Sequence, residues 1–223
     1  MVEAVLKFGG SLGEETNVLL KLAEKLSDLS TRHRLLVIPG GGRFADAARW
    51  YSERLHLSDA TSHRIAVVAM DQYGLLLSEK IRNSRMVLTL KEAVHVADSG
   101  KLPILLPSRL MRRVTSLPPS WDVTSDSIAA YIARTIKTER LVLITDVDGV
   151  FTVEPKLHRD ARLLERVTLD LLSNFRPRTC VDSYLPKVLK GSKLRCHIVN
   201  GRYPDRVCDI LEGRPTVSTE ILI

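Results

Sequence analysis

The sequence predicts an α/β protein built on a mainly parallel sheet, and two observations carry this prediction. An apolar strand, a glycine turn and an amphipathic helix follow one another twice within about fifty residues, which is the pattern of a parallel βαβ array. Leucine, isoleucine, valine and alanine dominate the apolar residues, whereas aromatic residues make up 5% of the chain. Buried parallel strands that helices cover on both faces favour this composition.

The first half of the chain contains three predicted strands and three predicted helices. Residues 2–8 form an apolar strand that ends at the Gly9-Gly10 turn, and Thr16 or Asn17 can cap a helix that continues to residue 29. A second strand at 35–38 ends at a proline and three glycines, and residues 44–55 return as a helix. Residues 61–81 predict a helix with one apolar face, and residues 104–106 predict a strand between two prolines.

The second half repeats the alternation of helices and strands. The loop at 108–120 carries three arginines and two prolines, which predicts a rim or flap. A helix predicted over 127–137 leads into a strand at 141–145, and a charged, irregular stretch then continues to Arg166. The last predicted elements are a helix at 169–174, a strand at 196–199, a helix at 205–211 and a strand at 219–223.

The charge of the chain favours an anionic small molecule over nucleic acid as a partner. The formal net charge is +7, from 33 lysines and arginines against 26 aspartates and glutamates. The basic residues are scattered, and the densest groups, at 32–34 and 109–113, are short and lack interleaved aromatic residues. Proteins that bind single-stranded nucleic acid need such stacking residues. We therefore expect a basic cleft for a phosphorylated molecule.

Cysteine content and hydropathy indicate a cytoplasmic protein. The chain has three cysteines without CxxC spacing, so neither a disulfide framework nor a zinc site is indicated. The longest apolar run, at 65–70, is far shorter than a membrane span, and residues 1–8 do not have the form of a signal peptide. We expect no membrane partner.

Five short segments together predict a phosphoryl-transfer site. They are KFGGS at 7–11, GGG at 40–42, DVTSD at 122–126, TDVDGV at 145–150 and LPK at 185–187. Their order places glycine turns, two lysines and a carboxylate at the ends of strands. Phosphoryl transfer needs cations and N–H groups around developing negative charge. The chain lacks the Walker and GxGxxG motifs, so the common nucleotide-binding patterns are excluded.

Each segment also has a purely structural interpretation. Lys7 could be an edge lysine whose stem lies on apolar surface, and the three glycines could be a flexible connection rather than an anion cradle at a helix start. Asp122 could simply cap a helix. Asp126 is better placed to orient ammonium groups. Asp146, Asp148 and Gly149 could form only a tight turn.

Taken together, the segments resemble the amino acid kinase family over nearly the whole chain. The resemblance runs from KFGGS through GGG, the DxTxD helix start and TDVDGVF to LPKV and the terminal VNGRYPDRVCDIL segment. It implies a three-layer α/β/α sandwich with an open, mainly parallel sheet of about eight strands, and a homodimer or higher homo-oligomer. It also implies an ATP-dependent phosphotransferase that uses Mg²⁺ carried by ATP, with no metal site made by protein side chains.

The resemblance assigns a role to each matching residue. Lys7 and Lys187 resemble the lysines that neutralise the transferred phosphoryl group, and Asp126 resembles the carboxylate that holds them. The residues that correspond to the ATP site are Gly9, Gly10, Ser11, Thr145, Asp146, Asp148, Gly149 and Phe151. The residues that correspond to the acceptor site are Gly40, Gly41, Gly42, Arg43 and Asp122. We expect one domain over 1–223, with an acceptor-binding half at about 1–110 and a nucleotide-binding half at about 111–223.

Within the family, the short length, PGGGRFAD and VDSYLPK are most similar to a subgroup of kinases in methanofuran biosynthesis. This similarity implies that the acceptor is the phosphate monoester [5-(aminomethyl)furan-3-yl]methyl phosphate, which becomes a diphosphate. Other phosphate-monoester kinases of the family, for uridylate or isopentenyl phosphate, are the alternative, as is a non-catalytic nucleotide- or oxyanion-binding protein of the same fold. Asp122 stands where acetylglutamate kinases have an asparagine, which argues against an N-acetyl amino acid acceptor.

Overall fold

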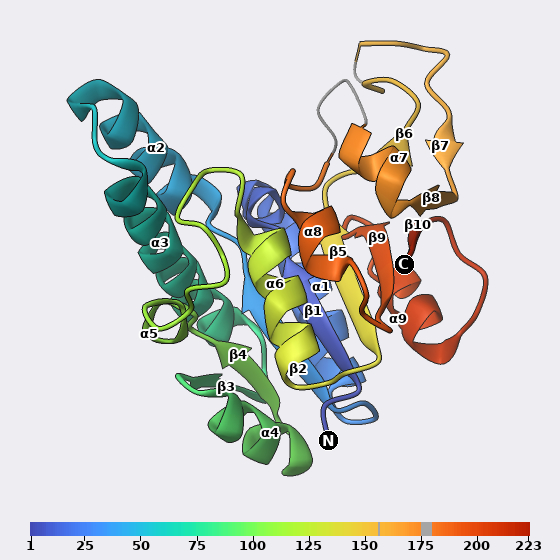
Figure 1. Ribbon diagram of the computed structural model, residues 1–223. Helices are drawn as coiled ribbons and strands as arrows, with labels where there is room; N and C mark the ends of the chain where they lie inside the picture. Colours follow the sequence, from blue (N-terminus) through green and yellow to red (C-terminus); the bar gives the residue numbers. More distant parts are fainter. Residues whose placement is uncertain (156, 175–179) are drawn as a thin grey trace.

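The protein forms a mainly parallel sheet with helices on both faces (Figure 1). The computed structural model describes residues 1–155, 157–174 and 180–223. Among these, eight strands follow the order β3-β4-β2-β1-β5-β9-β10-β8, in which the β9–β10 pair is antiparallel. The strands are β1 (Ala4–Phe8), β2 (Leu35–Pro39), β3 (Ser84–Val87), β4 (Leu102–Leu105), β5 (Arg140–Thr145), β8 (Arg166–Thr168), β9 (Arg195–Asn200) and β10 (Thr219–Leu222). A separate hairpin joins β6 (Val150–Phe151) to β7 (Leu163–Leu164).

The helices complete the three layers that the resemblance implies. Helices α4, α6 and α8 cover one face of the sheet, and α1 and α9 cover the other (Figure 1). Each face has its own cluster of buried apolar side chains beneath these helices. The helices are α1 (Thr16–Leu29), α2 (Gly42–Leu55), α3 (Asp59–Lys80), α4 (Leu90–Asp98), α5 (Ser108–Met111), α6 (Ser125–Thr135), α7 (Leu169–Asn174), α8 (Leu185–Leu189), α9 (Asp205–Glu212) and the 3₁₀ helix η1 (Gly10–Glu14). The predicted fold class is confirmed.

The order of the strands creates a switch point beside β1. The chain passes from β1 to β2 on one side and returns to β5 on the other side. Phe8, the last residue of β1, is paired with Pro39 of β2 and with Ile144 of β5. The segments that follow these three strands therefore begin at the same edge of the sheet. Open α/β sheets bind their ligands at such a position, outside the carboxyl ends of the strands.

Several elements differ from the sequence-based expectation. The segment 84–98, for which no element was predicted, forms β3 and α4. Strand β3 lies at the edge of the sheet and only Val87 is buried in it, so it lacks an apolar pattern. The charged stretch before Arg166 includes the hairpin of β6 and β7, and the expected flap includes α5. Helix α6 begins at Ser125, two residues earlier than predicted, which places Asp126 inside its first turn.

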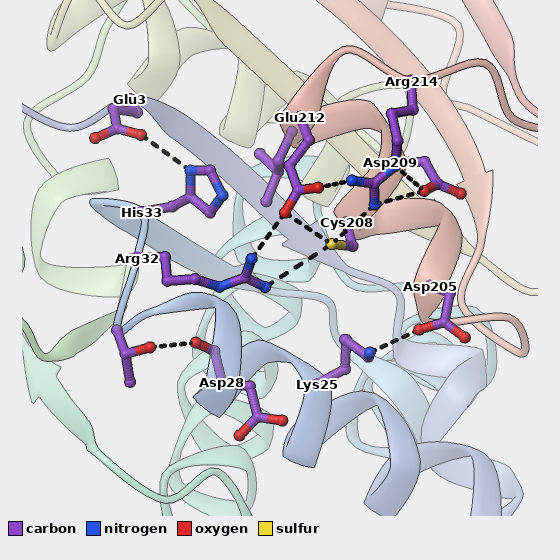
Figure 2. Close-up of polar contacts among 12 residues, drawn as sticks. Glu3, Lys25, Asp28, Arg32, His33, Asp205, Cys208, Asp209, Glu212 and Arg214 are labelled. Atoms are coloured by element: carbon purple, nitrogen blue, oxygen red, sulfur yellow. Dashed lines mark hydrogen bonds and ion pairs between the residues drawn. The ribbon is translucent and has the colours of Figure 1, made fainter.

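Ion pairs and hydrogen bonds join α9 to α1 and to the turn that follows α1 (Figure 2). Arg32 Nη1 lies 2.8 Å from Glu212 Oε1, and Lys25 Nζ lies 2.6 Å from Asp205 Oδ1. Most of these side chains are at least partly exposed, so each pair contributes at most about 1 kcal/mol. The buried apolar cluster beneath α1 and α9 therefore supplies most of the stability of this layer.

Candidate active site

The two glycine turns lie directly against each other at the switch point. Gly40 N donates to Phe8 O at 2.8 Å, and Gly9 N donates to Ile144 O at 2.8 Å. A Cβ atom added to Gly10 would lie 2.1 Å from Gly42 N, and one added to Gly40 would lie 2.6 Å from Gly10 N. Gly42 also has a φ of +53°. Only glycine allows this approach of backbone to backbone.

Lys7 and Asp126 form a buried ion pair beside these turns. Lys7 comes from β1, where its side chain lies on the same face of the sheet as Val5, which packs in the α6 cluster. Asp126 comes from the first turn of α6, a position that favours a carboxylate. Lys7 Nζ lies 2.9 Å from Asp126 Oδ1, and the two side chains are 9% and 6% exposed. The structure therefore brings these two predicted residues together.

Asp182 was not identified from the sequence, yet it is the most connected carboxylate of the site. It accepts hydrogen bonds from the backbone N–H groups of Thr124, Ser127 and Leu185, each at 2.9 Å. It also accepts from the hydroxyls of Thr124 at 2.9 Å and Ser127 at 2.5 Å. Its own N–H donates to Asp126 Oδ2 at 3.1 Å. An aspartate ahead of Leu185-Pro186, at the start of a helix, was the signal available in the sequence.

Two opposing effects act on the pKa of Asp182. Burial, and then the nearby charge of Asp126, raise this pKa above its ordinary value. The hydrogen bonds from Ser127 and Thr124 act in the opposite direction, and the net direction is upward. Backbone N–H groups can only donate, so the observed contacts are those of the ionised carboxylate.

Lys187 lies near the contacts of Asp126 and Asp182, but its ammonium group lies over the Tyr184 ring. It occupies the first turn of α8, where its side chain is exposed and its Nζ lies 5.0 Å from the centre of the Tyr184 ring. Of the two predicted lysines, only Lys7 is paired with Asp126 in the part of the chain that the structure describes. A cavity of about 350 Å³ opens beside Lys187, and Tyr131 and Tyr184 form part of its lining.

The loop after β5 is fixed by residues from the end of the chain. Asp148 Oδ1 accepts hydrogen bonds from Asn200 Nδ2 at 3.0 Å and from Arg206 Nη1 at 2.5 Å. A Cβ atom on Gly149 would lie 2.1 Å from Thr219 Oγ1, and the φ of Gly149 is +154°. The contacts of Asn200 and Arg206 were not predicted, although the VNGRYPDR segment that contains both residues was noted for its resemblance.

The remaining predicted ATP-site residues lie at or just after the end of β5, in η1 and in β6. Thr145 is buried at the end of β5, and its hydroxyl donates to Asp146 Oδ1 at 3.3 Å. Ser11 is exposed in η1, and Phe151 is half-buried in β6.

The predicted acceptor residues Arg43 and Asp122 contact two different segments. Arg43, in the first turn of α2, pairs with Glu14 of η1 at 2.9 Å, and both side chains are exposed. Asp122 accepts a hydrogen bond from Ser183 Oγ at 2.9 Å, so it contacts the segment before α8 rather than capping α6. Gly41, by contrast with Gly42, has an ordinary φ of −90°.

The described residues carry neither a metal cluster nor a membrane-spanning helix. Residues 1–155, 157–174 and 180–223 contain no group of three or more His, Cys, Asp or Glu side chains that could hold a metal ion. Within the same residues, no helix combines the length and the apolar character needed to cross a membrane.

The fold is that of a phosphotransferase family. A model of the amino acid kinase family matches residues 3–200, and the chain belongs to this family. It is 33% identical over 218 residues to the [5-(aminomethyl)furan-3-yl]methyl phosphate kinase of Methanocaldococcus jannaschii, a match that covers 98% of this chain and 97% of that protein. It is 23% identical to the uridylate kinase of Thermococcus kodakarensis, over 94% of this chain and 95% of that protein.

Solved structures of the same fold include two kinases. The uridylate kinase from Archaeoglobus fulgidus superposes with a TM-score of 0.79 at 21% identity, covering 99% of this chain and all of that one. A substrate complex of isopentenyl phosphate kinase superposes with a TM-score of 0.66 at 20% identity, covering 98% of this chain and all of that one. At these identities the likeness concerns the fold.

Proposed function

We propose that this protein is an ATP-dependent kinase that converts a small phosphate monoester into a diphosphate, with [5-(aminomethyl)furan-3-yl]methyl phosphate as its acceptor in methanofuran biosynthesis. The 33% identity to the kinase named for that acceptor, over 98% of the chain, is the observation that carries the proposal. The buried Lys7–Asp126 pair at the strand ends supports the reaction class, because a site that only binds an anion does not need a cation held by a carboxylate.

In the proposed reaction, a phosphate oxygen of the acceptor attacks the γ-phosphorus of ATP. The new P–O bond forms as the bond between γ-phosphorus and the bridging oxygen breaks, and ADP leaves with that oxygen. Lys7 and Lys187 neutralise the negative charge on the moving phosphoryl group. Asp126 holds Lys7 in place from the buried side. Lys187 has a flexible stem, and its ammonium group leaves the Tyr184 ring to reach the phosphoryl group.

The glycine turns fit the phosphates of a nucleotide. They offer a backbone surface without side chains at a strand-end switch point, where a Cβ atom would collide with the facing backbone. We propose that Gly9, Gly10 and Ser11 contact the phosphates and that the 145–151 loop contacts the nucleoside. Gly40–Gly42, Arg43 and Asp122 are the proposed acceptor contacts. Bound Mg²⁺ would supply positive charge between the phosphates, carried by ATP rather than by a protein metal site.

An ADP-release assay tests the proposal directly. Purified protein is incubated with MgATP and, in separate reactions, the aminomethylfuran phosphate, UMP, isopentenyl phosphate and acetylglutamate. We expect ADP release with the first acceptor and little with the others. Release with UMP or isopentenyl phosphate alone would replace the acceptor with that of the alternative kinases. ATP binding without release in any reaction would support a non-catalytic nucleotide-binding protein.

The proposal includes a homo-oligomer. Helices α2 and α3 carry many of the exposed large apolar side chains: Phe44, Trp50, Tyr51, Leu55, Ile65, Val68, Leu75 and Leu76. Extended exposed apolar surface is typical of a protein–protein interface. We further propose a cytoplasmic location, which the three free thiols support.

A further inference from the structure

We infer that Asp182 is a positioning residue of the kinase, which acts by joining the helix that carries Asp126 to the helix that carries Lys187. The inference rests on the proposed function, and it adds a role for a residue that the sequence motifs did not single out. Asp182 lies between the two elements in sequence and in space, since it contacts the start of α6 and the start of α8.

The two oxygens of the Asp182 carboxylate together accept hydrogen bonds from the starts of both helices. Oδ2 accepts from the N–H groups of Thr124 and Ser127 and from the Thr124 hydroxyl, all at the start of α6. Oδ1 accepts from Leu185 N at 2.9 Å, at the start of α8, and from the Ser127 hydroxyl at 2.5 Å. One carboxylate thus satisfies N–H groups of both helix starts, which would otherwise lack partners within their helices.

This arrangement couples the two charged residues of the proposed chemistry. Asp126 follows Thr124 by two residues, and Lys187 follows Leu185 by two residues. The backbone N–H of Asp182 also donates to Asp126 Oδ2, on the carboxylate that pairs with Lys7. A shift of α8 relative to α6 would therefore change the distance between the Lys187 ammonium and the Lys7–Asp126 pair. Misplacement of a catalytic group by about 1 Å costs up to a hundredfold in rate.

The alternative is that Asp182 only stabilises the fold, as any helix cap does. The chain offers a matched comparison in Thr89, which caps α4 in a capping box with Glu92, far from the strand-end site in sequence and outside the contacts described above. Removal of a purely structural cap lowers the melting temperature without changing the turnover of the folded enzyme. A positioning residue must change kcat.

The test compares Asp182→Asn with Thr89→Ala in the ADP-release assay, at a temperature well below both melting transitions. We expect Asp182→Asn to lower kcat by about tenfold or more, with a much smaller change in the KM for ATP. Thr89→Ala should keep the kcat of the wild type. If Asp182→Asn does not fold, Ser127→Ala removes one donor to the same carboxylate and should lower kcat in the same direction. Unchanged kcat in the folded Asp182 or Ser127 variant would overturn the inference.

A double variant shows whether the effect passes through Lys187. If Asp182 acts by placing Lys187, then adding Asp182→Asn to Lys187→Met should lower kcat little further, whereas independent effects would multiply. Multiplying losses would overturn the inference. Amide hydrogen exchange gives a readout that does not depend on activity: in Asp182→Ala, the Ser127 and Leu185 amides should lose protection together. Unchanged protection would refute the link between the helices, whereas a wild type inactive on every acceptor would refute only the proposed function.

Discussion

Replacement of Lys7 by methionine should separate the proposed catalytic role of this lysine from its structural role. Methionine is apolar and similar in length, so the variant removes the ammonium group and leaves most of the packing. The structure predicts two losses. Loss of a cation that contacts charge developing in the transition state should lower kcat by about a hundredfold or more. The folded state should also lose stability, because Asp126 would remain buried without its ion-pair partner.

The size of the stability loss follows from the burial of the pair. Lys7 Nζ and Asp126 Oδ1 are 2.9 Å apart, and both side chains are less than a tenth exposed. Removing one partner of such a buried pair costs roughly 3–5 kcal/mol, because the remaining charge has lost its compensation. The N–H of Asp182 still donates to Asp126 Oδ2, so we expect a value near the lower end, about 3 kcal/mol. An exposed lysine would show almost no such loss.

The double variant Lys7→Met with Asp126→Asn provides the control. It removes the uncompensated carboxylate, so it should recover part of the stability that Lys7→Met loses while kcat remains low. Urea unfolding followed by circular dichroism measures stability, and ADP release measures kcat. Lys187→Met should instead lower kcat with little change in unfolding, because Lys187 is exposed. The reasoning would be refuted if Lys7→Met kept the wild-type kcat, or if it lost activity but unfolded at the same urea concentration as the wild type.

Two further predictions concern other parts of the molecule. Gly10→Ala should raise the KM for ATP, because the added Cβ would lie 2.1 Å from Gly42 N and force the two glycine turns apart. The ADP-release assay measures this KM, and an unchanged value would show that the turns tolerate separation. Burial lowers the pKa of His63 below its usual 6.5. Below about pH 6.5 the unfolded chain therefore binds more protons than the folded protein, so the free energy of unfolding should fall as the pH drops. Urea unfolding at pH 7 and pH 5.5 should show a weaker pH dependence in His63→Gln, and equal slopes would contradict this assignment.

The layers and strand ends were predictable from the sequence because they depend on local patterns. Apolar strands that end in glycines and helices with apolar stripes identify the βαβ units without knowledge of the partner strands. The family resemblance supplied the three layers and the sheet of about eight strands, which the structure confirms. The sequence analysis predicted that Asp126 holds Lys7, but it did not predict that both side chains are buried. That burial depends on α6 covering β1, a contact between segments more than a hundred residues apart.

The contacts that were missed join distant segments through residues without a distinctive local pattern. Asp182 contacts Thr124 and Ser127 across 58 and 55 positions of sequence, and Arg206 contacts Asp148 across 58 positions. Nothing near these residues in the chain reveals their partners. Strand β3 was missed for a related reason: it is an edge strand held by pairing with β4, with one buried side chain to mark it.

The distribution of burial across the site suggests why one transfer machinery can serve different acceptors. On the side of the proposed phosphoryl transfer, Lys7 and Asp126 are buried and depend on each other, so a single change to either residue is costly. On the proposed acceptor side, Arg43 pairs with Glu14 between exposed side chains, and Asp122 bonds to the exposed Ser183. An exposed ion pair such as Arg43–Glu14 contributes at most about 1 kcal/mol, so substitutions there cost little stability and are free to change the fit of the acceptor. Relatives named for different acceptors are then expected to differ most on that side and least around Lys7, Asp126 and Asp182.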